Sequence, residues 1–434
     1  MRAVTKSAKM DAPRHVIISH VYSSDNKGDA ALTSVLIQDI ARVFPKARVT
    51  ILRLESIEKD SVFEGVPEKP SFMYYALNRY QNPMLKLIYT LYMMCITMVW
   101  ARCRRWTGKD VPLPQHLKAV SRLYESCDLI VPVGGGYIRS RKGWANRFNI
   151  PLLLHPLWIG HILGKPTVLY AQSMGPFENS FEKALTAHVL RRMSLILLRE
   201  DTSVELLASM GVTKNVQRAI DSGFLLTSAT DVDIRKNYHI PARKMLVGVT
   251  VRSWLSGQAQ VTYEESVARS LDMLVETYDA HVIFIPQVTA TKGDDDRITN
   301  NRVHDLMNHT GSTTLVDDEP DHHHIKAIYD KLDILLGTRF HSVIFSLTSF
   351  VPVVAIEYEH KTSGIMRDLD LSEWVIGIQE VTAPKLQKLL KKLVAEHATY
   401  KKELKQKLPP YIAKAQQAAQ LMADAYYTGH QGKS

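Results

Sequence analysis

Short apolar runs alternate with longer segments of helical periodicity along most of this chain. A short apolar run between polar turns is typical of a buried strand. Strands are predicted at residues 16–18, 49–52, 129–133, 167–170, 195–198, 246–251, 282–285, 314–316, 334–336 and 353–356. Strands that alternate with helices form parallel βαβ units with helices on both faces of the sheet. The pattern therefore predicts an α/β protein.

A polar and charged stretch at residues 227–241 separates two such series of strands and helices. The chain has 434 residues, whereas one hydrophobic core rarely grows beyond about 250–300 residues. We therefore predict an N-terminal α/β domain at residues 14–228 and a second α/β domain at residues 240–383. Residues 384–434 are lysine-rich with helical periodicity, so we expect a terminal helix packed on the body and a frayed tail after Tyr427.

An insert at residues 83–106 stands apart from the rest of the first domain. Its central run, residues 87–101, is uncharged and strongly apolar, and Arg102, Arg104 and Arg105 follow at once. The run is shorter than the roughly 20 apolar residues that a membrane-spanning helix needs. Two interpretations are open. The segment is either a buried or lid helix, or an interfacial helix whose apolar face enters lipid while its arginines bind anionic headgroups.

Charge and cysteine content narrow the range of partners and compartments. The net charge of +10 suits an anionic substrate, a membrane surface or nucleic acid. The sequence has no signature of a nucleic-acid-binding module, so nucleic acid ranks last. Three cysteines, Cys95, Cys103 and Cys127, lack the spacing of metal ligands, which argues against a zinc site or a disulfide framework. The residues up to Arg14 lack the apolar core of a secretory signal, so we expect a cytoplasmic protein.

The residues that follow each predicted strand are the first candidates for a site, because open α/β sheets bind ligands outside the carboxyl ends of their strands. Several of these residues are polar, charged or glycine. They are Asn26, Gly28 and Asp29, then Gly134, Gly135 and Gly136, then Gln172, Arg199 and Arg252. Glycine lets a backbone approach a ligand closely, and a guanidinium grips a carboxylate or phosphate with two hydrogen bonds.

Each of these candidates also has a structural explanation. Asp29 by itself is more readily the N-cap of a helix, and three glycines in a row are common in a plain strand-to-helix turn. Arg199 could pair with a nearby acid such as Glu200. We favour a ligand role for Arg199, because arginines at strand ends lie where ligands bind.

One segment, Gly337-Thr338-Arg339-Phe340-His341-Ser342, combines more of these features than any other. It lies between the apolar run 334–336 and a helix-like run at residues 342–349. A turn that opens a helix presents free backbone N–H groups, which favour an anion. Arg339 adds a fixed cation and His341 adds a titratable imidazole. The alternative is a surface arginine and a core histidine at an ordinary helix start.

Two clusters are read as structural. Residues 322–324 are three successive histidines, whose side chains point in different directions, so they cannot all bind one metal ion. We expect a solvated loop there. Residues 294–296 are three successive aspartates, for which we favour an exposed acidic loop. Three aspartates could instead bind a divalent ion or act as a base. Their position after a predicted strand also leaves open a contact with an acceptor.

In combination these segments resemble the polysaccharide pyruvyl transferase family. The resemblance is carried by residues 26–30, 134–136, 172–176, 199–203 and 337–342, and by residues 352–356 with Tyr358, Lys361 and Gly364. It runs from about residue 16 to residue 369. The family often has leucine where this chain has Phe340, a mild change between apolar residues.

The resemblance implies two Rossmann-like doubly wound domains that face a cleft, as in the GT-B glycosyltransferases. The first domain would be the acceptor side and the second the donor side. It implies phosphoenolpyruvate as the donor and a sugar with two nearby hydroxyls as the acceptor, with no metal or cofactor. The product would be a pyruvate ketal on a precursor of a capsule, exopolysaccharide or cell-wall glycan, which could be lipid-linked.

The resemblance also assigns roles to residues. Arg199 and Arg339 would hold the donor anion and His341 would be the acid/base group, with Arg339 beside it. The rest of the turn after residue 336 would contact the donor, through Gly337, Thr338 and Ser342. The acceptor or the cleft would be lined by Asn26, Gly28, Asp29, Gly134, Gly135, Gly136, Gln172, Arg252 and Lys361.

Two other functions compete with this one. A glycosyltransferase that uses a sugar nucleotide would hold a diphosphate in the second domain, with Arg252 or Arg339 on its phosphates. A non-catalytic scaffold of a membrane-bound glycan assembly would bind lipid or protein but no donor. The pair of Arg339 and His341 argues against the scaffold. Fold analogy alone does not separate the first two.

Overall fold

The computed structural model describes residues 11–54, 62–141, 148–230, 233–241, 244–290 and 294–428. These residues form two compact units. Unit 1 comprises the described residues of Met1–Ser23, Leu36–Asp221 and Gln416–Ser434, and unit 2 comprises those of Ser24–Val35 and Ser222–Ala415. The sequence places the boundary at residues 228–240, whereas the units meet along the chain at Asp221 and Ser222. The segment Ser24–Val35 belongs to unit 2 although it follows the first strand.

Unit 1 contains two four-stranded parallel sheets, in the orders β3-β2-β1-β4 and β5-β6-β7-β8. The strands are β1 His15–Val21, β2 Arg48–Arg53, β3 Glu68–Pro70, β4 Leu129–Pro132, β5 Gly135–Ile138, β6 Val168–Met174, β7 Leu195–Leu198 and β8 Val216–Arg218. Ile130 and Thr167 form a parallel bridge that joins the two sheets. The central strands are buried along their whole length, as parallel strands with helices on both faces must be.

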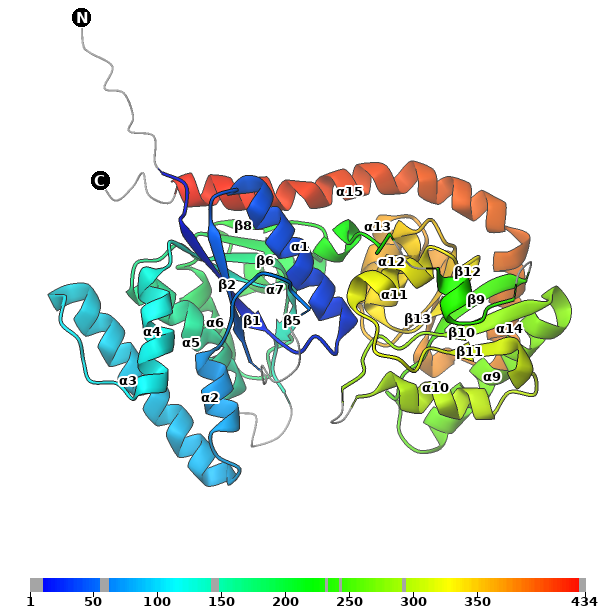
Figure 1. The fold of residues 1–434 in the computed structure, drawn as a ribbon, viewed down its shortest axis with the longest axis horizontal. Coiled ribbons are helices and arrows are strands. Elements are labelled where there is room, and N and C mark those ends of the chain that lie inside the picture. Colours follow the sequence, from blue (N-terminus) through cyan, green and yellow to red (C-terminus); the bar gives the residue numbers. More distant parts are fainter. Residues whose placement is uncertain are drawn as a thin grey trace, which may run out of the picture. The chain divides into compact units, whose positions relative to one another are not determined.

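Helices cover these sheets (Figure 1). They are α2 Phe72–Asn78, α3 Pro83–Thr107, α4 Gln115–Ser126, α5 Asn149–Ile162, α6 Ser180–Leu190 and α7 Asp201–Ser209. Helix α1, Lys27–Val43, begins in unit 2 and continues into unit 1 from Leu36.

Unit 2 contains one six-stranded parallel sheet, in the order β11-β10-β9-β12-β13-β14. The strands are β9 Met245–Thr250, β10 Ala280–Phe284, β11 Thr313–Leu315, β12 Ile334–Gly337, β13 Val353–Glu357 and β14 Val375–Gly377. Numbered within the unit, the order is 3-2-1-4-5-6, which is that of the Rossmann fold. The order reverses between β9 and β12. The carboxyl ends of these two strands are therefore where a doubly wound sheet binds its ligand.

The helices of unit 2 follow the same alternation with its strands. They are α8 Ile234–Asn237, α9 Gln258–Tyr278, α10 Asp296–Asp305, α11 His322–Tyr329, α12 Phe340–Thr348, α13 Lys361–Asp368 and α14 Ala383–Ala395. The last helix, α15 His397–Thr428, belongs to unit 2 up to Ala415 and to unit 1 from Gln416. The predicted terminal segment is thus two helices, and the tail at residues 429–434 lies outside the described residues.

The α/β class is confirmed, and every predicted strand is present. Four further strands, β3, β5, β8 and β14, were not predicted. All four lie at sheet edges and are only three or four residues long. An edge strand has a neighbour on one side only and needs no continuous apolar run, so its sequence gives little signal.

The apolar insert predicted at residues 83–106 forms one helix, α3, which extends beyond the uncharged run at residues 87–101. Asn82 caps its start by accepting hydrogen bonds from the N–H groups of Met84 and Leu85, and Gly108 ends it in the left-handed conformation. The resulting α3 has 25 residues, so the prediction that it is too short to span a bilayer is wrong. Within the described part of the chain, α3 is the one helix whose length and composition would allow it to cross a membrane.

Candidate active site

The turn between β12 and α12 is held by hydroxyl groups at the end of β9. Thr250 Oγ1 accepts hydrogen bonds from the N–H of Thr338 at 3.0 Å and of Arg339 at 3.3 Å, and lies 2.9 Å from Ser342 Oγ. Thr338 Oγ1 lies 2.9 Å from Tyr263 Oη. Thr338 and Ser342 are fully buried. Their hydroxyls help to fix the turn at the point where the strand order reverses, and the predicted contact of these two residues with the donor stays a prediction.

Arg339 is buried and makes an ion pair with Asp296. Its Nε lies 3.0 and 3.1 Å from the two carboxylate oxygens, and its Nη2 also donates to this carboxylate. Asp296 additionally accepts hydrogen bonds from the backbone N–H groups of Gln287 and Val288. Burial alone would lower the pKa of Arg339, but the adjacent Asp296 raises that pKa above its usual value. The guanidinium is a permanent cation whose position is fixed from within the unit.

A second carboxylate, Asp294, lies between two arginines. It accepts a hydrogen bond from Arg339 Nη2 at 2.9 Å and from Arg252 Nη2 at 2.9 Å. The Asp294 side chain is 45% exposed. The guanidinium of Arg252 also lies 4.8 Å from the ring centre of Trp254 and 4.4 Å from that of Tyr358. Two cations therefore converge on one carboxylate that solvent reaches.

The exposed acidic loop predicted at residues 294–296 is wrong in its central feature. Asp296 is 1% exposed, because it neutralises a buried arginine. Asp295 caps helix α10 by accepting a hydrogen bond from the N–H of Arg297. Only Asp294 has the exposure that the sequence suggested. The interaction with Arg339 requires contacts across more than 40 residues of sequence, which the local acidic pattern does not reveal.

The imidazole of His341 lies directly against Gly28. A Cβ atom placed on Gly28 would be 2.0 Å from His341 Nδ1 and 2.5 Å from His341 Cγ. Both residues belong to unit 2 and both are in the first turn of a helix, α1 for Gly28 and α12 for His341. Any side chain at residue 28 would occupy the space of the ring. Glycine at this position is thus required by the histidine rather than by backbone conformation.

Asn26 positions the start of α1 within unit 2. Its Oδ1 accepts hydrogen bonds from the N–H of Gly28 at 3.0 Å and of Asp29 at 3.3 Å, so Asn26 is the N-cap and the prediction of Asp29 in that role is wrong. Asp29 Oδ2 accepts a hydrogen bond from Asn26 Nδ2. Asn26 bridges Val288, and the Lys27 N–H donates to the carbonyl of Gln287. The same loop supplies the two N–H groups that bind Asp296.

Lys361, a further predicted residue of unit 2, lies near a different hollow. Lys361 is the first residue of α13 and forms an ion pair with Glu359 at 3.4 Å. Glu359 lines a hollow of about 200 Å³, together with Trp254 and Tyr358, whose rings contact Arg252.

The predicted residues of unit 1 take part in hydrogen bonds within that unit. Arg199 is buried, and its guanidinium donates to Ser173 Oγ at 2.8 Å and to Asp221 at 2.5 Å. Its acidic partner is thus Asp221 rather than Glu200. Gln172 is buried and donates to the carbonyl of Val133. These contacts hold the ends of β4, β6 and β7 together.

Close packing explains one of the three predicted glycines in unit 1, and backbone conformation explains a second. A Cβ on Gly134 would lie 2.9 Å from the carbonyl oxygen of Tyr170, and Gly135 has a φ of 144°. Gly136 is half-buried in β5. A backbone oxygen does not give way, so β6 itself requires glycine at residue 134.

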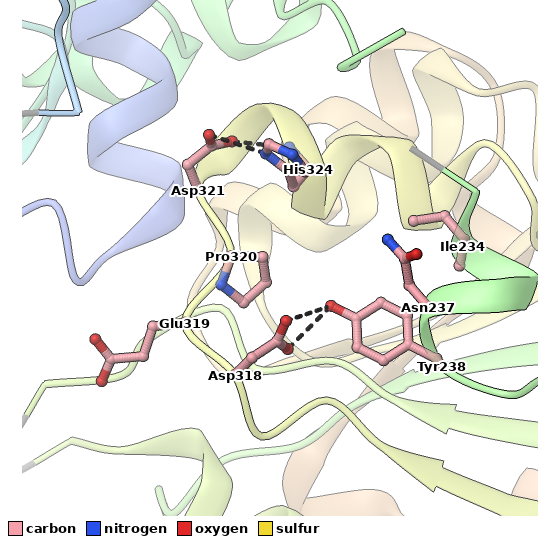
Figure 2. A pocket seen from close by; sticks show the side chains of 8 residues that line it. All are labelled: Ile234, Asn237, Tyr238, Asp318, Glu319, Pro320, Asp321 and His324. Atoms are coloured by element: carbon pink, nitrogen blue, oxygen red, sulfur yellow. Dashed lines mark hydrogen bonds and ion pairs between the residues drawn. The ribbon is translucent and has the colours of Figure 1, made fainter. Parts of the chain in front are cut away.

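A further hollow of unit 2, of about 390 Å³, is acidic (Figure 2). Tyr238 Oη donates to the carboxylate of Asp318 at 2.9 Å, and Asp321 forms an ion pair with His324 at 2.9 Å. Glu319 also lines this hollow, so three carboxylates would repel an anion here. The histidines of residues 322–324 open helix α11, and His322 is buried, so the predicted solvated loop is wrong. No group of residues suited to a metal ion occurs within the described residues.

Comparison with known proteins identifies the family. The sequence profile described as polysaccharide pyruvyl transferase matches residues 26–360. The chain belongs to the polysaccharide pyruvyl transferase family. The amylovoran biosynthesis protein AmsJ of Erwinia amylovora is 26% identical over 286 residues, which are 63% of this chain and 67% of AmsJ.

Solved structures confirm the GT-B-like fold of this pyruvyl transferase. A UDP-GlcNAc 2-epimerase from Neisseria meningitidis is similar with a TM-score of 0.58 and 11% identity, over 94% of this chain and 98% of that one. An α,α-trehalose 6-phosphate synthase from Burkholderia multivorans is similar with a TM-score of 0.52 and 11% identity, over 97% of each chain. At this identity the likeness concerns the fold alone.

The matched segment begins at Asn26, the residue that joins α1 to the turns of unit 2. The structure therefore brings together Asn26, Gly28, Asp29, Arg252, Arg339 and His341 within unit 2. Sequence reasoning missed Thr250, Tyr263 and Asp296 as the groups that position this cluster. Thr250 could have been found from the sequence, because it is a polar residue near the end of a predicted strand, two residues before Arg252.

The contact between Gly28 and His341 yields a direct test in this pyruvyl transferase. Gly28→Ala should lower kcat by about 10²-fold, because the new methyl would force the imidazole to move and a misplacement of ~1 Å can cost that much. The melting temperature should change little, since alanine is the better helix former by about 1 kcal/mol. The measurement is the rate of pyruvyl transfer, beside thermal unfolding.

Gly364→Ala is the matched control, because a Cβ there meets nothing within 4 Å and the residue also lies in a helix of unit 2. It should retain normal turnover. Equal turnover in the wild type and Gly28→Ala would show that the position of the His341 imidazole does not affect the reaction.

Proposed function

We propose that this protein transfers the pyruvyl group of phosphoenolpyruvate to a sugar with two nearby hydroxyls, forming a ketal on a cell-surface polysaccharide precursor. Membership of the polysaccharide pyruvyl transferase family and the likeness to an amylovoran biosynthesis protein support this class of reaction. The observation that carries the proposal is the seat of His341. Its imidazole, at the start of α12, packs on Gly28, and the same unit holds two arginines that share a solvent-accessible carboxylate.

The proposed reaction balances without an external oxidant or reductant. A proton adds to the methylene carbon of phosphoenolpyruvate, which becomes the methyl group of the product. One sugar hydroxyl attacks the neighbouring carbon, the bond from that carbon to the phosphate oxygen breaks, and inorganic phosphate leaves. The second hydroxyl then attacks the same carbon and closes the ring. Of the two hydroxyl protons, one replaces the proton given to the methyl group and the other ends on phosphate.

We assign the proton transfers to His341, whose imidazole can donate to the methylene carbon or accept from a hydroxyl near neutral pH. The first turn of α12 adds backbone N–H groups that stabilise developing negative charge. The donor-binding role predicted for Arg199 stays a prediction, because this arginine is held by Asp221 and Ser173 within unit 1.

We assign donor binding in unit 2 to Arg252 and Arg339, through exchange with Asp294. Both guanidiniums donate to this half-exposed carboxylate. Arg252 Nε is buried and has no hydrogen-bond partner among the described residues, so it can take up an anion. A carboxylate or phosphate of the donor would replace the Asp294 carboxylate on these cations. Asp296 would keep Arg339 in place during the exchange.

The exchange predicts the effect of neutralising Asp294. Asp294→Asn should lower the KM for phosphoenolpyruvate about three- to tenfold with little change in kcat, because an amide competes less well than a carboxylate for the two guanidiniums. Steady-state kinetics at fixed ionic strength measures this. Asp318→Asn, in the acidic hollow of Figure 2, is the control and should leave the KM unchanged. A KM that rises in Asp294→Asn would contradict the exchange.

The rival function is a glycosyltransferase that uses a sugar nucleotide. The arrangement that favours it is the site at the carboxyl ends of β9 and β12, where a sheet of this order also binds nucleotide phosphates. Thermal unfolding separates the two, since a ligand stabilises the folded protein that binds it. Stabilisation by phosphoenolpyruvate and not by UDP- or GDP-sugars supports pyruvyl transfer, and the reverse supports the rival.

The direct test is incubation with phosphoenolpyruvate and a panel of free and lipid-linked glycans. Mass spectrometry of the glycans and a phosphate assay follow the products. We expect a pyruvyl adduct on a glycan and an equal amount of phosphate. Transfer of a hexose from a sugar nucleotide, with no adduct from phosphoenolpyruvate, would overturn the proposal.

A further inference from the structure

Helix α3 has two opposite faces, and its own unit covers only one of them. The helix packs against α2, α4 and α5, and Figure 1 shows it at the outer edge of unit 1. Met93, Thr97, Trp100 and Ala101 are buried in that packing. Thr97 Oγ1 lies 2.9 Å from His155 Nε2 on α5. The helix is therefore anchored along its length and does not lie free to insert across a bilayer.

The other face of α3 is an exposed apolar stripe. It contains Met84, Ile88, Leu91, Tyr92, Val99 and Trp106, which lie on one side of the helix because Leu91 and Tyr92 are three and four residues from Ile88 and the other intervals are four or seven. Met84 is 71% exposed, Ile88 57% and Trp106 78%. We call these six residues the α3 stripe. A row of exposed apolar side chains on one face, unlike single scattered ones, marks contact with a partner or a membrane.

The charged residues on α3 itself and in the segments next to it in sequence are all basic. Residues 69–109 include seven lysines and arginines and no aspartate or glutamate. Arg104 pairs with Glu125 of α4, whereas Arg102 and Arg105 take part in no ion pair within the described residues. Arg102 and Arg105 lie one turn or less from Trp106, at one end of the stripe. A second copy of this chain would bring like charges together, whereas an anionic surface would complement them.

We propose that α3 lies in the plane of an anionic lipid surface, with the α3 stripe in the interfacial region and Arg102 and Arg105 on headgroups. An apolar face, flanking cations and an exposed tryptophan are the features of an interfacial helix. Anchoring of the opposite face to α2, α4 and α5 limits the helix to this depth. The inference rests on unit 1 alone and is independent of the reaction proposed above. It places the enzyme where a lipid-linked acceptor would be found.

Flotation of the full-length protein with vesicles tests this inference. The wild type should float with vesicles of phosphatidylcholine and phosphatidylglycerol, less at higher salt, and little with phosphatidylcholine alone. Ile88→Glu with Val99→Glu should lower the partition coefficient at least tenfold. Arg102→Gln and Arg105→Gln should each lower it about fivefold on the anionic vesicles.

The control is Phe181→Glu, which changes another highly exposed apolar residue of unit 1 outside the stripe. It should float as the wild type does, and thermal unfolding of all variants should match because the changed side chains are exposed or half-buried. No flotation of the wild type, or equal flotation of the wild type and Ile88→Glu/Val99→Glu, would overturn the proposal. So would a lipid-free dimer that this double variant converts to monomer, since a second copy would then cover the stripe.

Discussion

Replacement of His341 by alanine is expected to reduce phosphate release from phosphoenolpyruvate by about 10²–10⁴-fold, the range that general acid–base groups contribute. A loss of rate of this size is expected because the imidazole lies at the first turn of α12 and against the backbone of Gly28. Arg252 and Arg339 belong to the same unit. The side chain is half-buried at the edge of its helix, so its loss should leave the fold intact. Single-turnover kinetics with thermal unfolding measures both quantities.

His188→Ala is a suitable control for this experiment. His188 is an exposed histidine of α6 in unit 1, and its ring centre lies 4.9 Å from that of Trp158. It should retain the wild-type rate. A near-normal rate for His341→Ala with a normal melting temperature would remove the imidazole from the reaction, and with it the role of Gly28 as its seat.

Replacement of Asp296 by alanine is expected to cost about 3–5 kcal/mol of stability, because it leaves the guanidinium of Arg339 buried without its carboxylate partner. Asp296 is 1% exposed and also binds the N–H groups of Gln287 and Val288. Arg339→Ala should have a similar cost for the reciprocal reason. Urea denaturation of the variants measures the change through the midpoint of unfolding.

Asp294→Ala is the matched control for the stability prediction. It removes the other carboxylate from the same guanidinium, but Asp294 is 45% exposed, so the expected cost is below about 1 kcal/mol. Equal costs for Asp296→Ala and Asp294→Ala would contradict the assignment of Asp296 as the buried anchor of Arg339. Arg339 also has the proposed donor-binding role. A loss of donor binding in Arg339→Ala therefore has to be compared with the loss of stability in the same variant.

The sequence predicts the centre of each sheet better than its edges. A buried central strand such as β9 or β12 is a continuous apolar run, because helices cover both of its faces. The edge strands β3 and β8 are half-exposed and mix polar with apolar residues, and β14 has only three residues. Their pairing is decided by the strand beside them, which lies elsewhere in the sequence.

The candidate site is predicted only as far as it is local. The segment at residues 337–342 follows a strand and opens a helix, so its place was evident. The contact between Gly28 and His341 joins positions more than 300 residues apart, and no sequence pattern near either residue predicts it. Asp221 rather than the adjacent Glu200 pairs with Arg199 for the same reason, since tertiary packing selects the partner.

The apolar insert shows a different limit. Its sequence gives an apolar run, but the sequence does not state which face is covered. The structure separates Met93 and Trp100, which are buried, from Ile88 and Val99, which are exposed. The interpretation as a buried helix thus describes one face of α3, and the interpretation as an interfacial helix describes the other.

The fate of the oxygen that joins the enol carbon to phosphorus tests the central claim most directly. Phosphoenolpyruvate that carries a heavy-oxygen label at this position is incubated with the protein and an acceptor glycan. The account predicts that the label leaves with inorganic phosphate and that the glycan gains an unlabelled pyruvyl group, with neither product formed by His341→Ala. Label retained in free pyruvate, or an unmodified glycan, would contradict pyruvyl transfer at this site.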